Sequence, residues 1–381
     1  MALMSPSEVP VRKLNLLIVA SGLGIGGAES VMQQLAETID RSRFNVTVCC
    51  LKVLGVVGNE LVRRGIEVVT LSEPSERKAN YFLFLRLWRL IRLKQIDVVH
   101  THTTDGLTDA ALCKVLRPGL TLVHTFHFGN YPHLRSRQLW MERVGSRLAD
   151  RLLAVGETQR HQLRTAYGFS EARIATVRNG VPPSSGRDDG SFRASVGAGR
   201  RLLVGTMASL IQQKGLPDLI EVAARFRHRR DELCFIVVGE GYMRAELERL
   251  RREHDLDDMV VFTGWVPNAA DVALPAFDVF FQPSLWEAMS VALLEAMAAA
   301  KPIVATRVGE APFVLEDGGN ALLVNAKDID GMTFALTRVI DNAHLRRTLG
   351  CAAKRTVNEH FTVAGMTREY EEIYLKAGGW T

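Results

Sequence analysis

Two acidic side chains in the second half of the chain, Glu287 and Glu295, are eight positions apart. This spacing places Glu287 in a loop and Glu295 about one and a half turns into a helix that begins near Ser290. The first N–H groups of such a helix lack an intrahelical acceptor and point toward an anion such as a phosphate, while Glu295 could accept hydrogen bonds from a ribose. On spacing alone, Glu295 is equally typical of a solvated helix face. The N–H groups concerned belong to Ser290, Val291, Ala292 and Leu293.

A glycine cluster near the start of the chain, residues 21–30, lies between an expected strand and an expected helix. Gly22, Gly24 and Gly27 match the G-x-G-x-x-G pattern of dinucleotide-binding turns. A dehydrogenase also needs a carboxylate at the end of the second strand, but Lys52 stands there. The pattern therefore disfavours a nicotinamide cofactor and predicts a backbone that approaches a phosphate closely at a helix N-terminus.

Histidines and cysteines are the residues that could hold a metal. His100, His102, His124 and His127 lie near expected strand ends and could in principle ligate zinc. No cysteine or carboxylate completes such a set, so we expect no metal. The five cysteines are scattered and form no C-x-x-C pair, which favours buried thiols in a reducing cytoplasm.

The elements that must position these residues alternate along the chain. Short apolar runs such as residues 14–20 and 202–206 are separated by helical patterns, which is typical of βαβ units with a mostly parallel sheet. The 381 residues, 47% of them hydrophobic, suffice for two cores. We therefore predict an α/β fold of two Rossmann-like, doubly wound domains that face each other across an interdomain cleft. The expected divisions are a polar tail (1–13), an N-terminal acceptor-binding domain (14–181), a Gly/Ser/Pro-rich linker (182–201), a C-terminal nucleotide-sugar-binding domain (202–360) and a C-terminal helix packing back on the N-terminal domain (361–381).

Positive charge is concentrated in the first half, with a net charge of +9 over residues 1–181 and −4 over residues 182–381. No zinc finger, helix-turn-helix or RNA-binding signature accompanies it, so we expect no nucleic-acid partner.

The segment 77–95 interleaves basic and aromatic residues without an acid. It predicts an amphipathic helix that either touches an anionic membrane surface or packs its Leu/Trp face on the sheet. Without a spanning segment or a signal-like start, we expect a cytoplasmic protein, peripheral on the inner face of the membrane. The residues expected at that surface are Arg86, Arg89, Arg92 and Lys94.

Several short motifs occur together in the order typical of one enzyme family. The run EAMSVALLE, residues 287–295, resembles the E-x(7)-E motif of retaining glycosyltransferases of the GT-B fold, specifically family 4. The segment 26–29 resembles the family's GGxE phosphate loop, and Lys214 with Gly215 resembles its lysine–glycine loop. The resemblance spans residues 14–375. Other matching motifs are the histidine-bearing strand ends (97–102 and His127), Asn179-Gly180-Val181, Gly239-Glu240-Gly241, Met297-Ala298, Pro302 and Val308-Gly309.

The resemblance implies that a nucleotide-activated sugar binds mainly to the C-terminal domain and is transferred, with retention and without a required metal or cofactor, to an acceptor on the N-terminal domain. It also implies roles for particular residues. The diphosphate would be bound by Lys214, Gly26, Gly27 and residues 290–293, and the ribose would be bound by Glu295. Glu287 would bind the donor sugar's hydroxyls and stabilise an oxocarbenium-like transition state, and His127 would orient the sugar or the attacking hydroxyl. The GGAE form of the loop resembles that of surface-glycan assembly enzymes. It implies a UDP-hexose or UDP-N-acetylhexosamine donor and a glycan or lipid-linked acceptor, with GDP-mannose left open.

One position departs from the family pattern. Members usually carry an arginine five positions before the lysine, where this chain has Ser209. Loss of one charge-assisted contact would weaken donor binding by about 1.5–3 kcal/mol unless another basic residue replaces it. The alternatives are a compensated enzyme, or a weakened or non-catalytic protein that still binds a sugar nucleotide.

Overall fold

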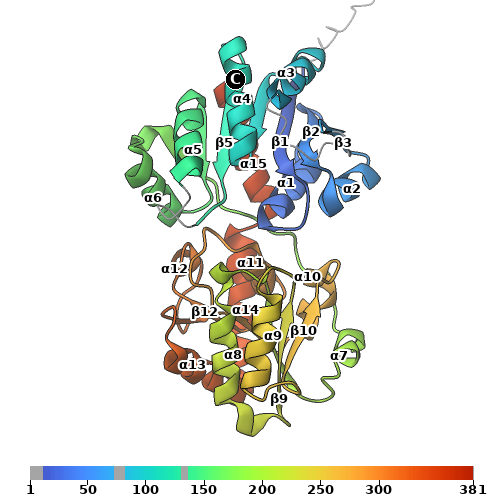
Figure 1. Ribbon diagram of the computed structural model, residues 1–381, viewed down its shortest axis with the longest axis vertical. Coiled ribbons are helices and arrows are strands. Elements are labelled where there is room, and N and C mark those ends of the chain that lie inside the picture. Colours follow the sequence, from blue (N-terminus) through green and yellow to red (C-terminus); the bar gives the residue numbers. More distant parts are fainter. Residues whose placement is uncertain (1–11, 73–81, 130–135, 381) are drawn as a thin grey trace, which may run out of the picture.

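The computed structural model describes residues 12–72, 82–129 and 136–380. The chain forms two α/β domains, one above the other in Figure 1, and each contains one parallel sheet with helices around it. In the described part of the chain, no helix is both long enough and apolar enough to cross a bilayer.

The N-terminal domain begins with β1 (Leu14–Gly22), which lies near the middle of its sheet. Leu16 and Ile18 point into one buried apolar cluster and Leu17 and Val19 into another, because helices cover both faces of the sheet. The other elements in chain order are α1 (Gly27–Thr38), β2 (Phe44–Val53), α2 (Gly55–Arg63), β3 (Glu67–Thr70), α3 (Leu83–Leu93), β4 (Val98–Thr101), α4 (Thr104–Leu116), β5 (Thr121–Phe126), α5 (Ser136–Leu148), β6 (Arg151–Ala154), α6 (Glu157–Tyr167), η1 (Glu171–Arg173) and β7 (Ile174–Thr176). The sheet order is β3-β2-β1-β4-β5-β6-β7, so the strand order reverses between β1 and β4.

The C-terminal domain repeats this arrangement with β8 (Leu202–Met207) near the middle. Its other elements are η2 (Gln212–Lys214), α8 (Leu216–Arg225), η3 (Arg227–Arg229), β9 (Leu233–Val238), α9 (Arg244–Glu253), β10 (Val260–Gly264), α10 (Ala269–Val272), η4 (Leu274–Ala276), β11 (Val279–Gln282), α11 (Val291–Ala298), β12 (Ile303–Thr306), α12 (Ala311–Val314), β13 (Leu322–Val324), α13 (Ile329–Asp341) and α14 (Ala343–His360). The sheet order is β10-β9-β8-β11-β12-β13, and the reversal falls between β8 and β11. Ligands of such sheets bind beyond the carboxyl ends of the strands at this reversal.

The last helix, α15 (Val363–Gly378), lies against the N-terminal domain. Tyr374 is fully buried there, and its hydroxyl hydrogen-bonds His100 Nδ1 at 2.6 Å. The hydroxyls of Thr367 and Thr38, on α15 and α1, are also 2.6 Å apart. The end of the chain therefore helps to hold the two domains together.

The structure adds a helix to one segment and corrects the expectation for one cysteine. The segment 182–201, expected to be a linker, contains a short helix, α7 (Ser191–Ser195). Phe192 on this helix is 6% exposed and contacts Phe277 of the C-terminal domain, so the burial of one aromatic ring orders a polar segment. The expectation of buried thiols is wrong for Cys351, which is exposed on α14, whereas the other four cysteines are buried.

Candidate functional site

The start of α11 lies at the boundary between the domains. Ser290 caps this helix: its Oγ accepts a hydrogen bond from the N–H of Leu293 at 3.2 Å and donates one to Gln282 Oε1 at 2.8 Å. Serine favours this position because its side chain satisfies an N–H that the helix cannot. The cap engages Leu293, so Val291 and Ala292 are the residues of the first turn whose N–H groups have no intrahelical acceptor.

Glu287 lies in the loop before α11 and is only 8% exposed. Lys214 Nζ is 2.6 Å from its Oε1, the Ser284 hydroxyl donates to Oε1 at 2.8 Å, and Gln213 Nε2 donates to Oε2 at 3.0 Å. The chain brings these groups together at Gly215, which has φ +61°, and a Cβ there would lie 2.0 Å from the carbonyl oxygen of Pro283. The buried carboxylate is thus fixed in one orientation, and the ammonium of Lys214 is fixed beside it.

Glu295 lies on α11 and is half-buried. Burial, with a smaller contribution from the charge of Asp271, raises the pKa of Glu295 to about 7. Within the described residues, its carboxyl group makes no hydrogen bond or ion pair. An acid that is half-buried, uncompensated and near neutrality in pKa is suited to accept hydrogen bonds from a ligand's hydroxyls.

The glycines of the N-terminal domain meet this helix from the other side. A Cβ on Gly27, at the start of α1, would lie 3.4 Å from Val291 Cγ2. The starts of α1 and α11 therefore face each other across the domain boundary, as Figure 1 shows for the two helices. A Cβ on Gly26 would lie 2.4 Å from the Glu29 carboxylate, so glycine lets that side chain fold back over the start of its own helix.

His127 follows β5 and hydrogen-bonds a second histidine. Its Nε2 is 2.8 Å from Nδ1 of His102, which follows the neighbouring strand β4. Burial lowers the pKa of His127 to about 4 and that of His102 well below its usual value. Both imidazoles are therefore neutral at pH 7, and His127 is suited to hydrogen bonding more than to carrying charge.

Two glycines bring backbone from both domains onto the Glu287 loop. A Cβ on Gly129, two residues after His127, would lie 2.2 Å from the carbonyl carbon of Glu287. From the C-terminal domain, Gly309 has φ +55°, and a Cβ there would lie 2.3 Å from the carbonyl oxygen of Glu287. Next to it, Glu310 is 1% exposed and reaches Arg178 Nε of the N-terminal domain at 2.9 Å. The backbone of the Glu287 loop thus lies where the two domains touch.

The remaining predicted residues are Ser209 and the basic residues of α3. Ser209 is exposed in the loop after β8. The basic residues of α3 lie at the end of the N-terminal domain remote from the C-terminal domain, as Figure 1 shows for this helix. That helix packs Leu83, Leu87 and Ile91 inward, in line with the sheet-packing alternative, and exposes its cationic side. All four predicted membrane residues are exposed, namely Arg86, Arg89, Arg92 and Lys94.

Sequence reasoning missed two residues of this site and one pairing. Gln213 and Ser284 hold Glu287, and His102 holds His127. Gln213 adjoins Lys214, and Ser284 stands three positions before Glu287, so their nearness in the chain was an available signal. The pairing of the two histidines follows from β4 and β5 being neighbours in the sheet, which the sequence pattern did not specify.

Comparisons with known proteins match both domains. Residues 25–185 match the family described as glycosyltransferase family 4, and residues 200–342 match the family described as glycosyl transferases group 1. The UDP-Gal:alpha-D-GlcNAc-diphosphoundecaprenol alpha-1,3-galactosyltransferase of Escherichia coli is 22% identical over 97% of this chain and 97% of its own length. A D-inositol 3-phosphate glycosyltransferase of Kribbella flavida is 31% identical over 68% of this chain and 66% of its own length.

Solved structures share the fold. The Anabaena protein HepE, crystallised with UDP and glucose, superposes with a TM-score of 0.86 at 19% identity, covering 95% of this chain and 100% of that one. The two Rossmann-like domains of the sequence prediction are therefore confirmed.

Proposed function

Since the chain belongs to the family 4-like glycosyltransferases of the GT-B fold, we propose that it moves a hexose or N-acetylhexosamine from a UDP-sugar to a hydroxyl of a glycan or lipid-linked acceptor. We propose further that transfer proceeds with retention and needs no metal. The UDP donor is supported by the galactosyltransferase relative, whose name specifies UDP-Gal and a diphosphoundecaprenol-linked acceptor. HepE, which binds UDP and glucose, supports it through the fold alone.

One observation carries the proposal: the buried carboxylate of Glu287 is held beside Lys214 in the loop that leads into α11. An ammonium has three donors, so Lys214 can bind Glu287 and a diphosphate oxygen together. The N–H groups of Val291 and Ala292 add donors and a partial positive charge at the same place. In this proposal the diphosphate lies between Lys214 and α11, and Gly26 and Gly27 let the backbone of the other domain approach the leaving phosphate.

The sugar and the ribose would lie on either side of that diphosphate. Glu287 would accept hydrogen bonds from the sugar's hydroxyls, and its negative charge would stabilise the developing positive charge at the anomeric carbon. Glu295 would accept hydrogen bonds from the ribose hydroxyls. His127, being neutral, would hydrogen-bond the sugar or the attacking hydroxyl and hold it in line.

Thermal unfolding with UDP, GDP, ADP and NAD in parallel tests the donor class. A ligand at about 100 times its Kd adds about 2.7 kcal/mol of stability, enough to shift Tm by several degrees. Stabilisation by UDP alone is the expected result, and stabilisation by NAD alone would overturn the proposal. With the donor known, NMR of the anomeric proton in a product distinguishes retention from inversion. Unchanged turnover in EDTA is the result expected without a metal.

We also propose that the cationic side of α3 touches an anionic membrane surface. Arg89 and Arg92 are exposed there, and so are Phe82, Leu85 and Leu93, which are 68%, 45% and 71% exposed. Basic and apolar side chains together on one exposed helix are typical of interfacial binding. Co-sedimentation with anionic vesicles should fall sharply in a variant with Arg89→Glu and Arg92→Glu, and unaltered binding would remove this part of the proposal.

A further inference from the structure

His102, the hydrogen-bond partner of His127, is held in one orientation. It directly follows β4, and its backbone N–H donates to the carbonyl oxygen of Val19 on β1 at 3.1 Å. Its side chain is only 3% exposed, and its ring lies against the ring of His100, with 4.0 Å between the two centroids. The imidazole of His102 therefore has little freedom to turn.

The neighbouring ring of His100 is itself held at both of its nitrogens. Its Nδ1 lies 2.6 Å from the hydroxyl of Tyr374 on α15, and its Nε2 lies 2.8 Å from the hydroxyl of Thr125 on β5. Both ring nitrogens of His100 are therefore occupied, and neither is left to accept a hydrogen bond from His102.

The hydrogen bond between His102 Nδ1 and His127 Nε2, which is 2.8 Å long, needs a hydrogen on one nitrogen and a lone pair on the other. Burial lowers the pKa of both rings, so each is neutral at pH 7 and carries a single N–H. Two arrangements satisfy this condition. In the first, His127 donates from Nε2 and the proton of His102 is on its Nε2. In the second, His102 donates from Nδ1 and the proton of His127 is on its own Nδ1.

The surroundings of His102 Nε2 favour the second arrangement. This nitrogen is buried and has no hydrogen-bond partner among the described residues. A buried N–H without an acceptor is rarer in proteins than a buried acceptor without a donor, so a lone pair at this position is favoured over an N–H. The second arrangement supplies that lone pair and puts an N–H at His127 Nδ1. His127 is partly exposed, and no described residue hydrogen-bonds its Nδ1.

We propose that His102 is a positioning residue for the transfer reaction: it donates to His127 Nε2 and so keeps the N–H of His127 at Nδ1, where a substrate oxygen can accept it. The proposal deepens the proposed function and rests on it, since His127 would meet the sugar or the attacking hydroxyl only in such an enzyme. A ring held in this way has no free nitrogen lone pair. His127 would therefore orient an oxygen atom and would not take up a proton as a base.

The position of the proton can be observed by NMR. In protein with isotope-labelled histidines, two-bond proton–nitrogen correlations distinguish an imidazole protonated at Nδ1 from one protonated at Nε2. The variants His127→Gln and His102→Leu identify the two sets of signals. We expect Nδ1–H for both residues in the wild type, and a mixture of tautomers for His127 in His102→Leu. A wild-type His127 protonated at Nε2 would overturn the proposal.

The effect on the reaction is measured as release of UDP from UDP-galactose, UDP-glucose or UDP-N-acetylglucosamine, with water as the acceptor. His102→Leu should lower kcat about tenfold, as expected for the loss of one hydrogen bond. His102→Asn places an amide N–H where Nδ1 lies, two bonds beyond Cβ. This variant should restore the single tautomer of His127 and bring kcat to within about threefold of the wild type.

His124 on β5 provides the matched control. It is 1% exposed, its Nδ1 lies 2.8 Å from the hydroxyl of Thr101, and its Nε2 is also buried without a partner among the residues described. His124→Leu thus removes the same kind of ring from the same sheet but leaves the bond between His102 and His127 in place. It should lower Tm about as much as His102→Leu does, while the tautomer of His127 and kcat stay unchanged.

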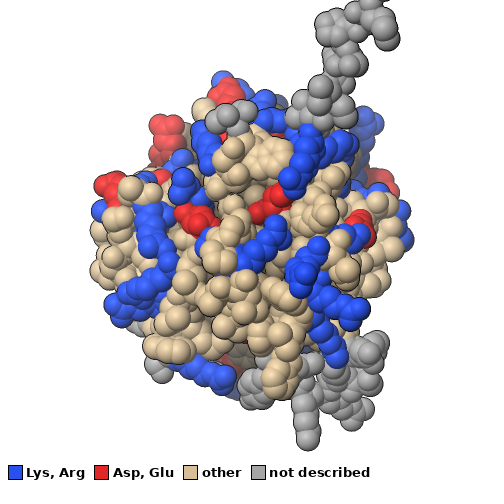
Figure 2. All heavy atoms as spheres, turned by 90° about the horizontal axis from the view of Figure 1, so that it is seen from above, with Lys and Arg blue, Asp and Glu red and all other residues tan. Residues whose placement is uncertain are grey.

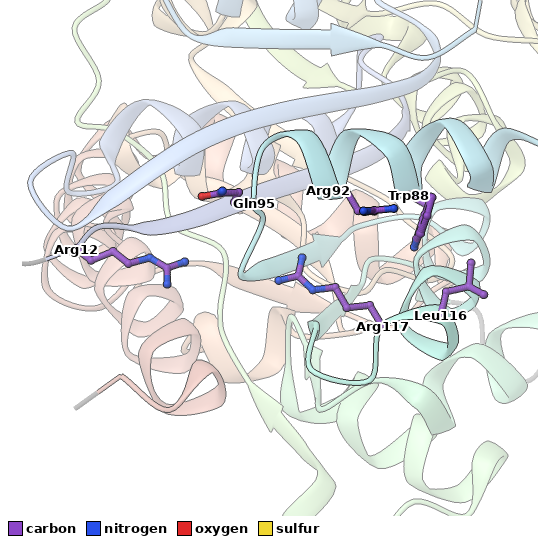
Figure 3. Close-up of a pocket in the computed structure, with 6 residues that line it drawn as sticks. All are labelled: Arg12, Trp88, Arg92, Gln95, Leu116 and Arg117. Carbon is purple, nitrogen blue, oxygen red and sulfur yellow. The ribbon is translucent and has the colours of Figure 1, made fainter.

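A second control lies at the far end of the same domain. Figure 2 looks onto that end of the molecule, and Figure 3 shows Trp88 beside Arg92 in a surface pocket there. Trp88→Leu replaces a half-buried ring by leucine and should leave both measurements unchanged. A loss of kcat in either control equal to that in His102→Leu would indicate a general loosening of the domain and would overturn the positioning role.

The two measurements separate this proposal from the one on which it rests. A single His127 tautomer in His102→Leu, or an unchanged kcat in that variant, would overturn the role of His102 and leave the proposed glycosyltransferase intact. If the wild type released no UDP from any of the three sugar nucleotides, the proposed donor class would be overturned, and the role of His102 with it. Because the wild-type spectrum alone locates the proton, the test does not depend on whether His102→Leu folds.

Discussion

Glu295 gives the proposed donor site a pH dependence that can be worked out in advance. Its pKa is raised to about 7 by burial and by Asp271. An ionised carboxylate accepts hydrogen bonds strongly at both oxygens, whereas the protonated acid uses one oxygen as a donor and is a much weaker acceptor for two ribose hydroxyls. UDP should therefore bind to the ionised form, and its affinity should rise as the pH passes through neutrality.

The size of the effect follows from the ionised fraction. With a pKa of about 7, roughly 9% of Glu295 is ionised at pH 6 and roughly 91% at pH 8. Apparent affinity is proportional to the competent fraction, so UDP should bind about tenfold more tightly at pH 8 than at pH 6. The folded pKa lies above the unfolded value of about 4.3, so the stabilising effect of burying the neutral acid is complete below pH 4.3 and is lost as pH rises through 7. That loss is on the order of 3 kcal/mol.

Calorimetric titration at pH 6, 7 and 8 measures the affinity, and 2′,3′-dideoxy-UDP is the matched ligand. It carries the same phosphates, so their own titration cancels, but it lacks the hydroxyls that Glu295 would hold. The dideoxy ligand and a Glu295→Gln variant should each show a flatter pH profile than UDP with the wild type. In urea unfolding, Glu295→Gln should not lose stability between pH 5.5 and 8. Identical pH profiles for UDP and its dideoxy form would refute the reasoning.

Three further predictions follow from the domain boundary and the donor loop. Gly129→Ala places a Cβ 2.2 Å from the backbone of the facing loop and should lower stability by about 1–3 kcal/mol and reduce turnover, whereas Gly119→Ala, which meets nothing within 4 Å, should be near neutral in the same melting and transfer assays. Arg178→Met leaves Glu310 buried without its ion pair and should cost about 2 kcal/mol in urea unfolding; a change under about 0.5 kcal/mol would contradict a structural role for the pair. Ser209→Arg should tighten UDP binding by roughly 10–150-fold in calorimetry if no other group has replaced the family's arginine, and unchanged affinity would indicate such a replacement.

Local patterns in the sequence predicted much of the fold. Continuous apolar runs identified buried parallel strands, as at residues 14–20, because both faces of such strands are covered. Ser290 predicted the start of α11 because a serine side chain can cap the first turn of a helix. Both signals act over a few residues, so one sequence suffices to read them.

Contacts between distant segments could not be predicted in this way. The pairing of His102 with His127 depends on β4 and β5 being adjacent, and a single sequence does not specify strand order. The helix α7 forms in a polar segment because Phe192 finds a partner in another part of the chain. The sequence spacing predicted four free N–H donors at the start of α11. In the structure, the side chain of Ser290 accepts a hydrogen bond from one of them, the N–H of Leu293. This depends on the orientation of the serine side chain, which spacing does not specify.

The position of Glu287 links donor binding to domain approach. Among the described residues, the partners of its side chain all belong to the C-terminal domain: Lys214, Gln213 and Ser284. Its backbone, however, is touched by Gly129 of the other domain at a separation that admits no side chain on that residue. A movement of the N-terminal domain away from this loop would leave the carboxylate's three donors in place but withdraw His127, which lies two residues before Gly129. The same motion can therefore separate His127, on the acceptor domain, from Glu287 and its three hydrogen-bond donors, on the donor domain, without disordering either group. An enzyme needs such a separation to release one product and admit the next donor.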